Sequence, residues 1–81
     1  MNRTLLFSSS NVQEIYKLYE ILNAEFLKRF KFSAEFRITT VSSSREFSLS
    51  VEDASEEERN WLKDATLKIL ERKFEKVVDE T

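Results

Sequence analysis

The chain contains no cysteine, histidine, glycine or proline, and its only methionine is the first residue. Without cysteine and histidine, disulfides and the usual zinc sites are excluded. No histidine is present to activate a serine nucleophile. P-loops, dinucleotide-binding turns and the KH-domain loop all need glycine, so these phosphate-binding and RNA-binding devices are excluded too.

Long apolar runs and a strong net charge are also missing. Thirteen basic and 15 acidic residues leave a formal charge of −2, so the whole chain has no net attraction to nucleic acid or an anionic membrane. No stretch reaches the roughly 18 apolar residues of a membrane span, and Leu5-Leu6-Phe7 is too short for a signal-peptide core. We therefore expect a cytoplasmic protein with no membrane partner.

The joint absence of glycine and proline bears on the origin of the chain. At average usage near 7 % and 5 %, chance absence of both has a probability on the order of 1 in 10⁴. A de novo designed α+β miniprotein with no biological function is therefore one hypothesis. Against it, a designer would place Asn-Gly or Asp-Gly in a hairpin turn, whereas Ser42-Ser43-Ser44 stands at the predicted turn. Abundant Glu and Lys instead fit a heat-adapted organism.

The length predicts a single small domain covering residues 1–81. A domain of this size buries only about 60–65 % of its unfolded surface, so its stability margin is thin. With no disulfide or zinc site, oligomerisation is the remaining common support for so small a core.

Residues 34–52 form the pattern around which the rest of the chain is organised. Two arms alternate with period two, which predicts a β-hairpin with one buried face. The buried side carries Ala34, Phe36, Ile38, Thr40, Phe47, Leu49 and Val51. The exposed side carries Glu35, Arg37, Thr39, Val41, Glu46, Ser48, Ser50 and Glu52. Because its aromatic residues lie on the buried side, the sheet does not offer the stacking platform of an RNA-recognition motif.

A short strand is predicted at Arg3–Ser8, with Leu5 and Phe7 pointing inward and Thr4 and Leu6 on the other side. A polar break follows, in which Ser10 or Asn11 caps the next helix.

The first helix is predicted at Val12–Phe30, and Gln13 stands at capping-box spacing from Ser10. Its apolar stripe comprises Val12, Ile15, Tyr16, Tyr19, Leu22, Phe26, Leu27 and Phe30. The second helix is predicted from Glu56 to about Asp79, and it begins with the capping box Ser55-x-x-Glu58.

The predicted order is therefore strand, helix, strand, strand, helix. If the third strand lies between the other two, all neighbours are antiparallel and both helices cover one face. This is a two-layer α+β domain with a three-stranded antiparallel sheet.

The second helix carries more apolar surface than one sheet and one helix can cover. Its apolar residues are Trp61, Leu62, Ala65, Leu67, Ile69, Leu70, Phe74, Val77 and Val78. They sweep roughly 260° of the helical wheel, against the ~100° of an ordinary surface helix. Leu18 and Ile21 lie off the main stripe of the first helix. The predicted partner surface comprises Leu18, Ile21, Trp61, Leu67, Phe74 and Val78.

The charged clusters have plain structural interpretations. Lys28, Arg29 and Lys31 complement the dipole at the end of the first helix. A contact of these residues and Arg37 with RNA is the alternative. Glu56–Glu58 fan out around a helical turn and cannot converge on one metal ion. Since periodicity buries no carboxylate, we expect no catalytic site, no cofactor, no metal and no small-molecule substrate.

Over its full length the chain resembles the small dimerising subunit of the KEOPS complex, which is involved in threonylcarbamoyl-adenosine modification of tRNA. The resemblance lies in length, in element order, in the short polar break before Val12, and in the acidic, serine-containing link that runs from Val51 to Ser55. The family's last helix commonly carries an Arg followed four residues later by Asn-Ser. Arg59 matches the first, and Lys63-Asp64 replaces the second.

The resemblance implies a non-catalytic interaction subunit that contacts tRNA only through its complex. The departure at Lys63-Asp64 points to a divergent paralogue that pairs with the standard subunit rather than with itself, and from the sequence a homodimer and a heterodimer both stay open. A heat-loving archaeal source fits both the composition and the family.

Overall fold

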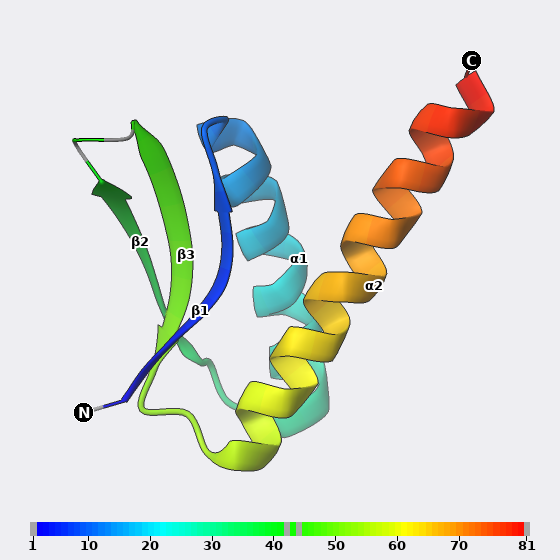
Figure 1. Cartoon of the computed structure of the whole chain (residues 1–81). Helices are drawn as coiled ribbons and strands as arrows, with labels where there is room; N and C mark the ends of the chain where they lie inside the picture. Colours follow the sequence, from blue (N-terminus) through cyan, green and yellow to red (C-terminus); the bar gives the residue numbers. More distant parts are fainter. Residues whose placement is uncertain (1, 42, 44, 81) are drawn as a thin grey trace.

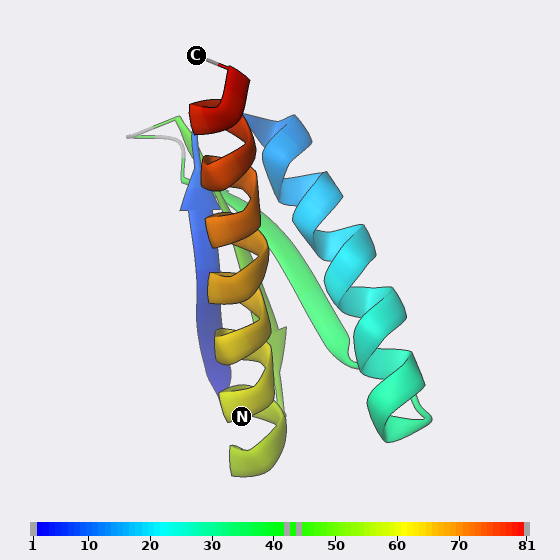
Figure 2. The ribbon, with the colours of Figure 1, turned by 90° about the vertical axis from the view of Figure 1, so that its right-hand side faces the viewer.

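A computed structural model describes the backbone of residues 2–41, 43 and 45–80 and the side chains of residues 2–40, 43 and 45–71. Along the chain the elements are β1 (Arg3–Ser9), α1 (Val12–Phe30), β2 (Glu35–Val41), β3 (Glu46–Glu52) and α2 (Glu56–Glu80) (Figure 1). The sheet order is β1-β3-β2, and both neighbouring pairs are antiparallel. Both helices lie on one face of the sheet (Figure 2). The predicted α+β fold is confirmed.

The core lies between the central strand and the two helices. Its fully buried members are Ile15, Leu22, Phe26, Leu49, Val51 and Leu62. The hairpin residues Phe36, Ile38 and Phe47, predicted to be buried, are only half-buried against this core. Phe36 and Ile38 stand on an edge strand and keep one open flank. Phe47 stands on the central strand, but close to its beginning.

β1 differs from its predicted geometry because it contains a bulge. Leu5 pairs with Ser50 and Phe7 pairs with Leu49, so Leu6 is an extra residue in the strand. A bulge turns two successive side chains toward the same face. Leu6 and Phe7 therefore both pack against the core, while Leu5 is 58 % exposed. The prediction that Leu5 points inward and Leu6 outward was wrong.

α1 buries a different face from the predicted stripe. Leu18, predicted to lie outside that stripe, is a core residue with 3 % exposure. Tyr16 and Leu27, predicted within it, are 53 % and 47 % exposed. The buried face is thus rotated toward Leu18, because α1 packs on β1, β3 and α2 at once. A tyrosine tolerates such an exposed position since its hydroxyl remains hydrated.

Both helices begin with side-chain caps. Asn11 caps α1, and its Oδ1 accepts a hydrogen bond from the Gln13 N–H at 3.0 Å. The predicted capping box of α2 is confirmed: the Ser55 N–H donates to Glu58 Oε1 at 3.0 Å, and the Glu58 N–H donates to Ser55 Oγ at 3.2 Å. α1 ends at Lys31, whose left-handed backbone lets its N–H reach the Leu27 carbonyl at 2.9 Å.

Candidate interaction surface

Within the part of the chain that the structure describes, no group of three or more acidic side chains is arranged to hold a metal ion. In the same residues, no buried side-chain nitrogen or oxygen lacks a hydrogen-bond partner. None of the described helices combines the length and apolar character needed to cross a bilayer.

The predicted partner residues do not form one surface. Leu18 lies in the core, so its assignment to a partner surface is corrected. Trp61 is half-buried and packs edge-to-face against Phe26 and Phe30, with ring centroids 6.0 and 5.7 Å apart. Phe74 and Val78 lie outside the residues whose side chains are described. Ile21 and Leu67 remain as exposed apolar residues on α1 and α2.

Ile21 and Trp61 contribute to a groove of about 370 Å³ between α1 and α2. The groove is lined by Ile21, Glu25, Trp61, Asp64, Ala65, Lys68 and Ile69. Lys68 forms an ion pair with Asp64 across one helical turn at 3.3 Å, so part of the polar rim is neutral. Its apolar lining residues are Ile21, Trp61, Ala65 and Ile69.

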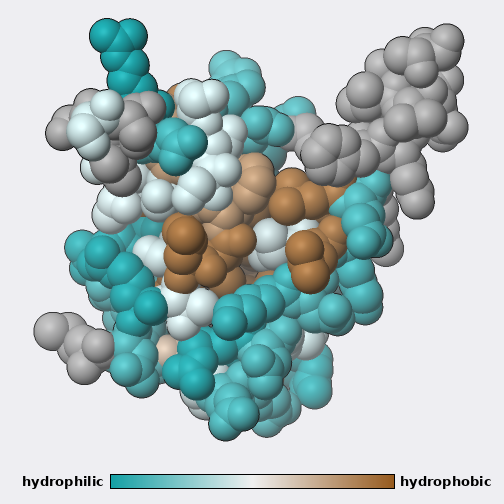
Figure 3. Space-filling view, in the orientation of Figure 1, coloured by the Kyte–Doolittle hydropathy of each residue, from teal (hydrophilic) through white to brown (hydrophobic). Residues whose placement is uncertain are grey.

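Leu67 lies on the opposite side of α2 from this groove and is 61 % exposed. On the helical wheel it lies more than about 100° from the groove residues Trp61, Ala65 and Ile69. Figure 3 shows apolar side chains gathered between β1 and α2 and bordered by polar ones. Leu6 and Phe7 on β1 are only partly buried. We call this area between the two elements the β1–α2 surface; the apolar residues of β1 and α2 that keep exposed surface include Leu6, Phe7, Leu67 and Leu70.

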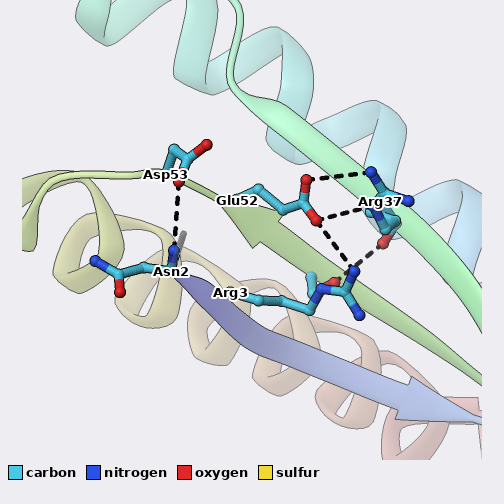
Figure 4. Close-up of polar contacts among 6 residues, drawn as sticks. Asn2, Arg3, Arg37, Glu52 and Asp53 are labelled. Atoms are coloured by element: carbon cyan, nitrogen blue, oxygen red, sulfur yellow. Dashed lines mark hydrogen bonds and ion pairs between the residues drawn. The ribbon is translucent and has the colours of Figure 1, made fainter.

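The outer face of the sheet is polar and carries an ionic cluster at one end (Figure 4). Arg3 on β1 donates to Glu52 Oε1 at 3.0 Å. Arg37 on β2 approaches the same Oε1 with Nε at 3.0 Å and donates to Oε2 at 3.2 Å. The Arg3 hydrogen bond is the largest influence on the pKa of Glu52. Together with Arg37 it holds that pKa below the ordinary value of 4.5, although desolvation acts in the opposite direction.

Two of the four cations considered for RNA contact already have partners. Arg37 is held by Glu52, and Arg29 lies 3.7 Å from Glu57 and over the ring of Phe30. Lys28 and Lys31 are exposed at the end of α1, where they complement the helix dipole. The geometry therefore gives the predicted basic cluster a structural role.

Several exposed apolar residues were missed by the sequence reasoning. Leu5, Tyr16 and Leu27 were assigned to the core, and Phe32 was assigned no role. Periodicity could not place Leu5 because three apolar residues are consecutive there. For α1, the predicted stripe together with Leu18 and Ile21 covers more than half of the helical wheel. The pattern therefore does not decide which part of this apolar arc faces the core.

No protein-family model matches the chain, and comparison with curated proteins and with solved structures found no match either. The fold and the surfaces thus define an α+β domain whose most prominent functional candidates are apolar contact areas.

Proposed function

We propose that the chain is a non-catalytic, dimerising interaction subunit of a KEOPS-like complex for threonylcarbamoyl-adenosine modification of tRNA. The observation that carries the proposal is the β1–α2 surface, an apolar area between β1 and α2 (Figure 3), together with the exposed Leu67 on α2. Partners are protein subunits, and tRNA is reached only through the complex. The proposal includes no cofactor and no small-molecule substrate.

The length of α2 makes a protein partner physically reasonable. Its 25 residues extend for about 37 Å at 1.5 Å per residue. Figure 1 shows the ribbon of its C-terminal part leading away from the sheet. A specific interface buries about 800 Å² on each partner. One long face of such a helix, with the adjoining strand, can supply an area of that order.

The KEOPS assignment draws on the resemblance in element order and on Arg59. In the structure, Arg59 Nη1 donates to the Ala54 carbonyl at 3.4 Å, which ties the start of α2 to the preceding link. Lys63 and Asp64, which replace the family's Asn-Ser, are exposed on α2. A changed pair at an exposed helical position supports a paralogue with an altered choice of partner.

A designed miniprotein is the second candidate, favoured by the absence of glycine and proline. Lys31, Arg45 and Asp53 nevertheless adopt positive φ angles of 70°, 55° and 54°. Such positions cost a non-glycine residue on the order of 1 kcal/mol, and idealised designs avoid them. A design with no biological function would bind no KEOPS subunit.

The test is sedimentation of the purified chain, alone and with separately purified KEOPS subunits. We expect the wild type to enter a stable complex and Leu67→Glu to abolish that complex, because a charge in an interface core loses its hydration. Leu27→Glu is the matched control, since Leu27 is also an exposed leucine but lies on α1. Binding by neither the wild type nor the control, or equal loss in both variants, would contradict the proposal.

A further inference from the structure

The groove between α1 and α2 lies on a different side of α2 from Leu67, so it is separate from the β1–α2 surface. Its volume of about 370 Å³ falls within the roughly 300–1,000 Å³ of sites that hold small molecules. Five of its lining residues follow one face of α2: Trp61, Asp64, Ala65, Lys68 and Ile69. At about 1.5 Å per residue, this face extends for about 12 Å. A groove of this size and length suits a short, extended ligand.

The two helices run antiparallel, which gives the groove two different ends (Figure 1). Trp61 packs on Phe26, the residue that follows Glu25 on α1, so Glu25 belongs to the Trp61 end. Ile21 lies one turn earlier on α1, and Ile69 lies two turns later on α2. Both isoleucines therefore belong to the other end. One end of the groove is aromatic and acidic, and the other is aliphatic.

The indole of Trp61 is held in place by α1. Its ring centroid lies 6.0 Å from that of Phe26 and 5.7 Å from that of Phe30, with interplanar angles of 72° and 89°. Two nearly perpendicular contacts restrict the rotation of the ring, and Trp61 still keeps exposed surface in the groove. Among aromatic side chains, an indole attracts cations most strongly. The Trp61 end therefore favours a positively charged group.

The charges of the groove favour the same kind of ligand. Lys68 is paired with Asp64 at 3.3 Å, so these two residues neutralise each other. Glu25 is exposed, and no described side chain forms an ion pair with it. Two carboxylates and one ammonium leave one negative charge, which belongs to Glu25. A cation at the Trp61 end therefore meets both an aromatic ring and an uncompensated carboxylate.

The rest of the groove is apolar. Ala65 lies one turn from Trp61 and one turn from Ile69, and its methyl group leaves space between the two larger side chains. Ile21 lines the groove from α1 and is 44 % exposed. An apolar chain placed there removes this surface from water. The groove thus offers contacts for an apolar body as well as for a cation.

We propose that the groove binds a small organic cation, in which an ammonium or guanidinium group is carried on a short apolar chain. The cation lies beside Glu25 and Trp61, and the chain lies over Ala65 toward Ile69. A metal ion does not fit, since the described residues contain no group of three or more acidic side chains that could hold one. The ligand is bound without being transformed, so the inference goes beyond the proposed function and does not depend on it.

The experiment titrates the full chain with hexyltrimethylammonium and follows the fluorescence of Trp61, which is the only tryptophan in the sequence. Hexanol and hexanoate carry the same alkyl chain without the positive charge. We expect saturable binding of hexyltrimethylammonium at millimolar concentration or below, and binding of hexanoate that is weaker by about tenfold or more. Absence of saturable binding, or equal affinity for hexyltrimethylammonium and hexanoate, would overturn the proposal.

A matched pair of variants tests the role of Glu25. Glu25→Gln removes the uncompensated charge and should weaken hexyltrimethylammonium binding by about fivefold, because charge contacts of exposed groups are modest. Glu20→Gln removes another exposed carboxylate of α1, one that does not line the groove, and should leave binding unchanged. Equal effects of the two variants would mean a general attraction of cations to the chain and would contradict a site at Glu25.

A third variant tests the apolar part of the groove. Ala65→Leu fills the space between Trp61 and Ile69 and should weaken hexyltrimethylammonium binding by about tenfold or more. Circular dichroism melts establish that the variant remains folded. Unchanged affinity in a folded Ala65→Leu variant would place the ligand elsewhere. If this variant fails to fold, Glu25→Gln and Glu20→Gln decide the question, because both positions are exposed.

Discussion

The two edges of this sheet have the same length but arise from different sequence patterns. In β2, apolar and polar residues alternate from Glu35 to Thr39, and the register with β3 is unbroken. In β1, three consecutive apolar residues cannot alternate, and the strand bulges to bring both Leu6 and Phe7 to the core. The comparison shows that one residue out of alternation is enough to interrupt the register of an edge strand.

The largest effect on stability is expected at a residue of the central strand that stands opposite both edge strands. Leu49 on β3 stands opposite Phe7 of β1 and Ile38 of β2 and is fully buried. Leu49→Ala should destabilise the fold by about 2–5 kcal/mol, because it leaves a cavity between the edges and the helices. Denaturant melts measure this loss. A cost below about 1 kcal/mol, within the range of surface substitutions, would show that the core is centred elsewhere.

The bulge itself predicts a contrast between adjacent leucines. Leu6→Ala should cost about 1–3 kcal/mol, less than a fully buried leucine because Leu6 is only partly covered. Leu5→Ala should stay within about 0.5 kcal/mol, since Leu5 faces solvent. The two variants are compared in the same denaturant series. A larger loss of stability in Leu5→Ala than in Leu6→Ala would mean that Leu5 points inward and that β1 contains no bulge.

The smallest effect is expected at Glu52 on β3, which pairs with Arg3 of β1 and Arg37 of β2. The pKa of Glu52 is lowered in the folded chain, so its contribution to stability is present above the ordinary carboxylate pKa of 4.5 and is lost as pH falls below it through the folded value. Glu52→Gln should therefore flatten the pH dependence of stability below pH 4.5. Thermal melts from neutral to acidic pH measure it, with Glu46→Gln as the exposed control on the same strand. Equal profiles for wild type and Glu52→Gln would contradict the ionic cluster.

The element order and sheet could be predicted because their signals are local and strong. The alternating arms around Phe36 and Leu49 define the hairpin, and the Ser55 and Glu58 capping box marks the start of α2. With those elements placed, a short hairpin and a right-handed crossover from β1 leave few topologies. The observed order β1-β3-β2, in which every neighbouring pair is antiparallel, is one of them.

The candidate surfaces could be predicted only in part. The excess of apolar residues on α2 predicted that Leu67 would remain uncovered, and it does. The same reasoning failed for Leu18, because a helical wheel shows which residues share a face but not which face meets the sheet. Trp61 was predicted for a partner surface. It packs on Phe26 of α1 instead, and such a contact depends on how the two helices are placed relative to each other, which a helical wheel does not show.

The most direct test of the difference between the two edges is amide hydrogen exchange of the full chain. The account predicts that amides around the bulge at Leu5–Phe7 exchange faster than the β2 amides that pair with β3, because the bulge interrupts the ladder of backbone hydrogen bonds there. Protection as strong around Leu5–Phe7 as on the paired side of β2 would contradict it, since β1 would then contain no bulge.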